Sequence, residues 1–542
     1  MRSSTDEESR PFISGSTPPT PSPSPPASGP ISWSSLPGKP QLAILFLCRL
    51  VDFLQIASLQ AYLFYQLRSL SPELSDADIS YQAGILQGCF TGSQVVTAIL
   101  WGKAADAAWC GRKRVLLIGL VGTAASCLGY GFAGSFAGVA AWRMVAGAVN
   151  GTVGIIRTMI SEIIKERKYQ SRAFLILPLS FNVASILGPI IGGFLANPST
   201  TLPSLFGPDA IFGCAWMLNH PFALPSVVNC ILLLAAAAVA FFGLDETSPA
   251  RLGKRDLGRS LWARLTRTQT TAAYTRVSAM PLETFLEDDQ EAKAPLAMAV
   301  AVVGKPRQLP FWRVWTRNVV LTLISQALYD FHLGGFTNLW SLFLSTPRAT
   351  SGVLLPVSFT GGLGMSAATV GTATAILGVL GITLQLTFYP AVNAVLGTLR
   401  SFQYFLPLFP VAYIIAPYLA AVPSSTTAPD AASGFWVWSG IVLVQLLQVT
   451  ARTFTLPASI ILLNNCSPHP SVLGTIHGLG QSVSAAFRTV GPIVSGQWYG
   501  AGLEAGMVGL GWWGIAGVGV LGGVSGMFLY NGSGHEIMLE GE

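Results

Sequence analysis

Long apolar stretches recur along the chain and are separated by short polar segments. A helix needs about 20 mainly apolar residues to cross the hydrocarbon core of a bilayer, and twelve stretches meet that need. They cover residues 41–66, 82–102, 114–134, 137–162, 172–196, 225–244, 317–345, 367–391, 400–422, 435–463, 471–498 and 507–530. A polar stretch after the sixth cannot span. The pattern predicts an all-α membrane protein with twelve transmembrane helices in two six-helix halves.

This division sets the expected domain boundaries. Residues 1–40 are rich in Ser and Pro, lack the apolar core of a secretory signal, and are predicted to form a disordered cytosolic tail. Residues 41–244 form the first half and residues 317–530 the second. Residues 245–316 are a cytosolic central loop, and residues 531–542 a second cytosolic tail.

Composition agrees with a membrane protein and excludes several other classes. Only 10% of the residues are charged and 51% are hydrophobic, whereas soluble domains carry about 25% charged residues. The formal net charge of +6 is too modest for a nucleic-acid partner. The seven Cys form no CxxC pair and the five His have no metal-ligand spacing, so we expect neither a metal nor a cofactor. The sequence also carries no motif of a membrane enzyme.

Basic residues are distributed unevenly between the two sides of the membrane. If the N-terminus is cytosolic, the side opposite the cytosol holds only Arg68 and Arg348. Lys and Arg are enriched in cytosolic loops, so both termini are predicted to be cytosolic. The expected location is the plasma membrane or the vacuolar membrane.

The loop between the second and third spans carries a recognisable motif. It reads WGKAAD and then, after three residues, CGRKR. This resembles the signature of the major facilitator superfamily, although two residues are inserted and an alanine replaces a usual basic residue. The resemblance implies that Gly102, Asp106, Gly111, Arg112 and Lys113 form a gate. In the family, the aspartate and arginine pair across the cytosolic helix ends and steady the outward-facing state.

The fourth span contains a charge that hydrocarbon disfavours. Arg143 precedes Gly147 by four residues, which is similar to the R-x-x-x-G motif of the same family. An arginine within a span is costly and is therefore a functional candidate. The resemblance implies a role for Arg143 in proton-linked transport; a structural arginine satisfied by helix-end carbonyls is the alternative.

The fifth span ends in a run of small residues. Gly188, Pro189, Gly192 and Gly193 resemble a motif of antiporters in the superfamily, chiefly drug:proton exporters. Gly491–Gly496 echoes this run in the eleventh span. Parallel repeats of this kind are a transporter architecture, with the substrate site between the halves.

The resemblance covers nearly all of residues 41–530. It narrows to the fungal drug:proton antiporter-like and zinc-induced facilitator-like group, which implies the major facilitator fold.

Polar residues within the spans follow helical spacing. Arg49 and Asp52 are three residues apart, and Gln326 and Asp330 are four apart, so each pair shares a helix face. Facing lipid would leave such groups unpaired in hydrocarbon, so we predict that they line a central cavity or pair between helices. The predicted lining residues are Arg49, Gln326, His332, Gln448, Arg452, His477, Gln481 and Arg488.

Asp330 and Asp52 are the predicted proton carriers, in that order. A carboxyl group in a low-dielectric site holds a proton more readily than one in water. Asp330 has no Lys or Arg within one turn on its own helix, whereas Arg49 can keep Asp52 ionised. A permanent ion pair between Arg49 and Asp52 is the alternative. For His332 and His477 a hydrogen-bonded structural role is favoured over proton transfer.

These observations predict a proton-coupled antiporter that exports a small organic molecule, such as a drug or metabolite. Its expected partners are this substrate, the proton and the lipid bilayer, and it is expected to act as a monomer. Two alternatives stay open. One is a facilitator of metal-chelate transport, and the other is a membrane nutrient sensor that signals through its central loop without transporting.

Overall fold

The structure is a computed structural model. It describes residues 36–107, 109–164, 169, 173, 175–207, 210, 213–248, 251, 256–266, 309–349, 356–469, 472–532, 536 and 537. Residues 1–35 of the predicted tail and residues 267–308 of the predicted central loop lie outside the described residues.

The first half is built from long helices joined by short connections. Its long helices are α1 (Lys39–Leu70), α2 (Asp76–Asp106), α3 (Arg112–Gly131), α4 (Phe136–Val149), α5 (Thr152–Ile163), α7 (Ile176–Leu195) and α11 (Ala223–Gly243). Three short helices lie between α7 and α11, namely α8 (Pro198–Thr201), α9 (Pro203–Phe206) and α10 (Ala215–Asn219). The ten-residue helix α12 (Leu257–Thr266) lies in the predicted central loop.

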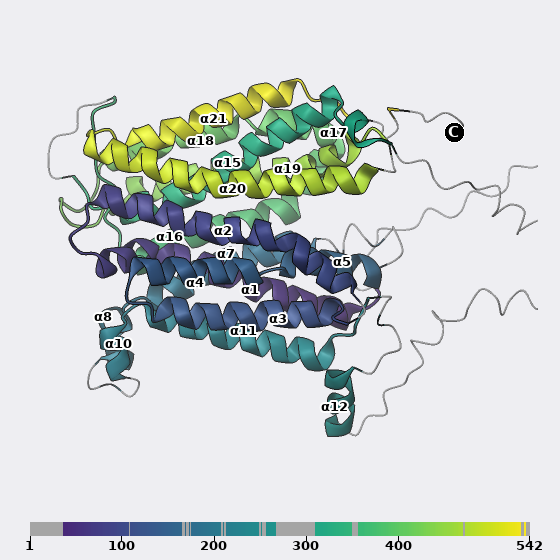
Figure 1. The fold of residues 1–542 in the computed structure, drawn as a ribbon. Coiled ribbons are helices and arrows are strands. Elements are labelled where there is room, and N and C mark those ends of the chain that lie inside the picture. The colour runs from purple at the N-terminus through teal and green to yellow at the C-terminus, as the bar shows by residue number, and fades with distance from the viewer. Residues whose placement is uncertain are drawn as a thin grey trace, which may run out of the picture.

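The second half has the same plan. It begins with the 3-10 turn η5 (Phe311–Val314), and its helices are α15 (Arg317–Ser345), α16 (Ala367–Thr383), the π-helix η6 (Leu384–Phe388), α17 (Tyr389–Phe405), α18 (Leu408–Ile415), the 3-10 turn η7 (Ala416–Ala421), α19 (Phe435–Asn465), α20 (Leu473–Glu504) and α21 (Gly509–Met527). The two sets of helices lie on opposite sides of the molecule (Figure 1).

The helices agree with the predicted crossings. Nine helices among the described residues are long and apolar enough to span a membrane. Two more, α2 and α20, have 31 and 32 residues but contain more polar side chains. Ala367–Ala421 counts as one 55-residue helix, too long for a single crossing, and Gly397 interrupts it with φ of 70°. With these included, the arrangement is consistent with twelve crossings.

One predicted helix is broken. The run over 137–162 was expected to be continuous, but α4 ends at Val149 and α5 begins at Thr152. Asn150 leaves the helical conformation, with φ of −84° and ψ of 76°, and its side chain donates a hydrogen bond to Asp52 in α1. A tertiary contact therefore replaces the local helical geometry at this point.

Small residues allow the two halves to approach closely. A methyl group added at Gly84 in α2 would lie 2.5 Å from the carbonyl oxygen of Pro492 in α20. A methyl group added at Gly371 in α16 would clash with the carbonyl oxygen of Pro189 in α7. The α2–α20 pair lies side by side where the two halves meet (Figure 1). The echoed glycine–proline runs thus both face the other half.

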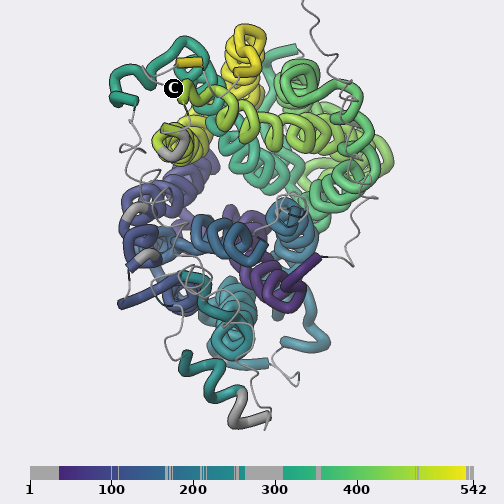
Figure 2. The backbone as a smooth tube through the Cα atoms, turned by 90° about the vertical axis from the view of Figure 1, so that its right-hand side faces the viewer, coloured from purple at the N-terminus to yellow at the C-terminus, as the bar shows by residue number. Residues whose placement is uncertain are grey.

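The molecule has two distinct ends. We call one the basic end, defined by Arg112, Lys113, Arg114 and Arg259; α5 and α12 lie there (Figure 1). Helices α8 and α10 lie at the other end. Viewed from the basic end, the purple-to-teal half and the green-to-yellow half are two separate groups of helices (Figure 2). We predict from the distribution of Lys and Arg that the basic end faces the cytosol.

Candidate functional site

The carboxylate of Asp52, in α1, has three bonding partners. Asp52 is 1% exposed and forms an ion pair with Arg49, as the spacing on α1 predicted. Its carboxylate also accepts hydrogen bonds from Asn150 Nδ2 at 2.6 Å and from Thr152 Oγ1 at 2.8 Å. Both donors come from the break between α4 and α5. The broken helix thus serves to hold the Asp52 carboxylate.

Asp330 is held more loosely. Gln326 Nε2, one turn away on α15, donates to it at 2.8 Å. Arg488 of α20 places its Nε 3.6 Å from Asp330 Oδ1, and Ser484 Oγ accepts from the same guanidinium at 2.7 Å. The side chain of Asp330 is 7% exposed and that of Arg488 is 45% exposed. A buried carboxylate is therefore in contact with a solvent-accessible arginine.

Arg488 is one of four arginines whose charges act on one another. The charge of Arg488 interacts with those of Arg49, Arg157 and Arg452. Arg49 and Arg157 belong to the first half, and Arg452 and Arg488 belong to the second. Arg157, in α5, was not among the predicted lining residues. Its only signal in the sequence is an arginine within an apolar run.

The arginines outnumber the carboxylates that neutralise them. Asp52 pairs with Arg49, and Asp330 contacts Arg488. Among the described residues, Arg157 and Arg452 have no acidic partner. An excess of two positive charges therefore lies between the halves, where it would attract a negatively charged group.

Two phenylalanines connect the arginines across the halves. The guanidinium of Arg49 lies 3.6 Å from the ring centroid of Phe53, and that of Arg452 lies 3.9 Å from the ring of Phe181. The two rings meet edge to face at 5.1 Å. Such cation–π contacts are favourable when desolvated. Arg452 thus reaches from the second half to an aromatic pair of the first.

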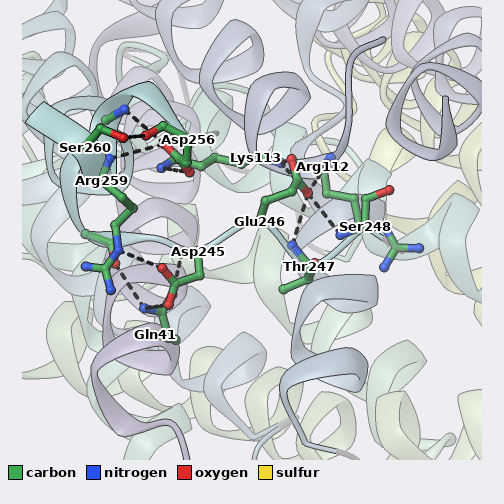
Figure 3. Close-up of polar contacts among 12 residues, drawn as sticks. Gln41, Arg112, Lys113, Asp245, Glu246, Thr247, Ser248, Asp256, Arg259 and Ser260 are labelled. Carbon is green, nitrogen blue, oxygen red and sulfur yellow. Dashed lines mark hydrogen bonds and ion pairs between the residues drawn. The ribbon is translucent and has the colours of Figure 1, made fainter. Parts of the chain in front are cut away.

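The motif loop forms a second polar cluster, at the basic end (Figure 3). Glu246, just beyond α11, accepts hydrogen bonds from the backbone N–H of Arg112 at 3.0 Å, Thr247 at 3.1 Å and Ser248 at 3.1 Å. Its carboxylate therefore caps the positive end of α3. Gly111 precedes that helix with φ of 81°, and an added methyl group would lie 2.5 Å from Glu246 Oε2. A glycine is required there.

The basic side chains of the motif find acidic partners in other segments. Lys113 Nζ donates to Asp256 at 2.7 Å, and Arg112 forms an ion pair with Glu162 of α5. Arg259 of α12 lies 2.7 Å from Asp245 (Figure 3). The cluster therefore ties α3 to α5, α11 and α12. The side chain of Asp106 lies outside the described part of the chain, so its pairing stays a prediction.

A comparison with protein families finds a match that covers most of the chain. Residues 42–492 match the model of the Major Facilitator Superfamily. The chain belongs to the Major Facilitator Superfamily. It is therefore an integral, multi-pass membrane transporter, as the resemblance of its motifs indicated.

Individual relatives support this assignment. The chain is 31% identical over 508 residues to the Major facilitator superfamily multidrug transporter mfsB of Aspergillus fumigatus. The matched region covers 89% of this chain and 81% of the relative. The chain is 23% identical to Protein ZINC INDUCED FACILITATOR 1 of Arabidopsis thaliana, covering 84% and 83%. The crystal structure of the human organic anion transporter MFSD10 (TETRAN) covers 91% of this chain and 100% of its own, with 18% identity and a TM-score of 0.54. At that identity the likeness concerns the fold alone.

The other predicted lining residues lie in surroundings that differ from those of Asp330 and Arg488. His332 is fully buried within the second half, with Nδ1 3.0 Å from the hydroxyl of Tyr413 and its ring against Phe409. Gln448 is 1% exposed. His477 Nε2 lies 3.2 Å from Asn464 Oδ1. Gln481 is exposed. Of the predicted lining residues, Arg49, Gln326, Arg452 and Arg488 thus come together with Arg157, and we call these five residues the central cluster. His332 instead packs among aromatic rings of the second half.

Arg143 in α4 and the glycine–proline run in α7 are both tightly packed. Arg143 is 3% exposed and its guanidinium lies 4.5 Å from the ring of Phe90. Added methyl groups at Gly188 and Gly192 would press on the backbone of α1, and one at Gly193 would clash with Ala367 of α16. The glycine–proline run of the fifth predicted span, Gly188 to Gly193, thus holds α7 between α1 and the other half.

Proposed function

We propose that this transporter exports a small organic molecule from the cytosol and couples that movement to protons. Asp330 is the proposed proton-binding carboxyl group. The observation that carries the proposal is the contact between Asp330 and Arg488. A 3.6 Å ion pair with a 45% exposed arginine leaves a buried carboxylate only partly neutralised. Such a group can exchange a proton when the surroundings of Arg488 change.

Asp52 is the second candidate and is less suited to cycling. Its carboxylate accepts from Arg49, Asn150 and Thr152 at once. All three contacts are made to the carboxylate, and hydrogen bonds to an ionised acceptor are stronger than those between neutral groups. We therefore propose that Asp52 fixes the α4–α5 break, and that Asp330 titrates.

The direction of export is supported by contacts at the two ends. At the end opposite the basic end, the halves meet through Ser341, which donates to the carbonyl of Gln60, and through Gly500, which packs against Ala77. Arg488 and Arg157 remain exposed on the other side of these contacts. The arrangement fits loading from the basic end. The names of two relatives, a multidrug transporter and the Efflux pump azaK of Aspergillus niger, also favour export.

The uncompensated charges of Arg157 and Arg452 favour a cargo with an acidic group. The Phe53–Phe181 pair beside them offers an apolar surface for the body of such a molecule. Among the described residues, no group of three His, Cys, Asp or Glu could hold a metal ion. We therefore propose an organic cargo over a bare metal ion.

Flux measurements test the proposal. Metabolite profiles of cells with and without the protein identify candidate cargoes, which are then tested in inside-out vesicles. We expect accumulation that a protonophore abolishes. A protein that binds a candidate without moving it would instead be a sensor, and accumulation unaffected by a protonophore would contradict proton coupling.

A further inference from the structure

Another buried arginine lies in α4, and none of the described acidic side chains forms an ion pair with it. Arg143 in α4 is 3% exposed. Its Nη2 reaches Gln87 Oε1 only at 3.5 Å, and its Nε has no hydrogen-bond partner. The titratable groups that act on it most strongly are Tyr130, Cys127, Tyr62 and Cys89, and none of them is a carboxylate. Phenols and thiols of this kind carry no charge at neutral pH.

Other unpaired polar groups surround Arg143. It lines a cavity of about 20 Å³ together with Gln55 of α1, Tyr130 of α3 and Asn229 of α11. These three residues are 5%, 6% and 3% exposed. Gln55 Nε2 and the Tyr130 hydroxyl have no hydrogen-bond partner, and neither does Asn229 Oδ1. Four helices of the first half thus bring unpaired polar groups to one small cavity.

Leaving these groups unpaired would be costly. A buried polar atom without a partner destabilises the fold, and a buried unpaired charge destabilises it more. The cavity is large enough for one particle of about the size of a water molecule. A water molecule could accept from Arg143, Gln55 or Tyr130 and donate to Asn229 Oδ1, but it would leave the guanidinium charge uncompensated. A small anion would accept from the same donors and neutralise the charge, and the Asn229 carbonyl would take no part in binding it.

We propose that this cavity binds a single small inorganic anion of the chloride class. Arg143 supplies the charge, and the side-chain amide of Gln55 and the hydroxyl of Tyr130 donate hydrogen bonds. The space beside Arg143 holds one water-sized particle and lies within one half of the molecule. The proposal therefore stands apart from the proposed transport mechanism, and its ligand binds whether or not Asp330 carries protons.

Halide titration of the purified full-length protein tests this site. Chloride replaces gluconate at constant ionic strength while the thermal unfolding midpoint is measured. We expect the midpoint to rise and saturate with chloride or bromide in the wild type, and not in Arg143→Gln.

Tyr130→Phe keeps the test decisive if Arg143→Gln fails to fold. The hydroxyl has no protein partner, so its removal breaks no internal hydrogen bond. We expect half-saturation to need roughly tenfold more chloride, because a hydrogen bond to a charged group is lost. Arg114→Gln, at the exposed basic end, should respond like the wild type. Equal midpoints in chloride and gluconate, or an unchanged response in Tyr130→Phe, would show that the cavity holds water only and would overturn the proposal.

Discussion

Pro189 in α7 and Pro492 in α20 make the same contact from opposite halves of the molecule. Each directs its carbonyl oxygen at a glycine of the other half, Gly371 in one case and Gly84 in the other. The glycine preceding each proline packs against the first helix of its own half, Gly188 against α1 and Gly491 against α15. The sequence echo between the fifth and eleventh spans is thus a repeated packing unit that closes one end of the transporter.

This relationship predicts that Gly371→Ala opens that end. The added methyl group clashes with a backbone carbonyl, which cannot move as a flexible side chain would. Spin labels at the exposed residues Glu73 and Glu504 should therefore lie farther apart in the variant. Gly517→Ala is the matched control, since nothing lies within 4 Å of its added methyl group. An unchanged label distance in Gly371→Ala would show that the contact does not hold the halves together.

The two glycines of the motif loop should respond differently to alanine. Gly111 has φ of 81° and its methyl group would press on Glu246. Strained backbone of this kind costs about 1–3 kcal/mol, so Gly111→Ala should lower the thermal unfolding midpoint. Gly102 lies within a helix with nothing within 4 Å, so Gly102→Ala should leave it unchanged or raise it. Equal effects of the two variants would contradict the proposed capping of α3 by Glu246.

The two aspartates should separate stability from transport. Asp52→Asn leaves Arg49 buried without an acidic partner, which we expect to cost roughly 3 kcal/mol or more. Asp330→Asn keeps its contact with Gln326, and Arg488 is solvent-accessible, so the protein should fold normally. Size-exclusion profiles after heating measure both effects. A stable Asp52→Asn protein would argue against the structural role of that carboxylate.

The excess of positive charge predicts a preference for acidic cargo. Arg157→Gln and Arg452→Gln should each weaken the binding of an acidic substrate roughly tenfold or more, since each removes an interaction with a charged group. Arg114→Gln, at the basic end, is the matched control. Binding is measured by displacement of a labelled substrate. An effect on neutral substrates as large as on acidic ones would show that the arginines do not select charge.

The orientation can be tested with a natural cysteine. Cys214 is exposed in the segment between α7 and α11, which is predicted to lie outside the cytosol. Burial raises the pKa of the Cys110 thiol, and raises that of Cys466 to about 11, so both stay protonated at neutral pH and react slowly. An impermeant maleimide should label intact cells that carry the protein at their surface, and Cys214→Ser should abolish the labelling. Labelling only after permeabilisation would reverse the orientation.

The sequence predicted what depends on periodicity along one helix. The apolar runs identified the spans, and the spacing of Arg49 and Asp52 identified an ion pair within α1. It did not predict the partner of Asp330, because Arg488 approaches from α20, more than 150 residues away. The acidic partner of Arg112 was missed for the same reason, since Glu162 lies in α5. Contacts between helices depend on packing, which helical periodicity does not encode.

The central claim is that Asp330 carries the proton, and reconstituted vesicles test it most directly. Wild-type protein and Asp330→Asn are placed in liposomes, and cargo movement is measured with an imposed pH gradient and again by exchange without a gradient. The account predicts that the wild type accumulates cargo with the gradient, whereas Asp330→Asn exchanges cargo but does not accumulate it. If Asp330→Asn accumulates cargo with the same pH dependence as the wild type, Asp330 is not the proton carrier.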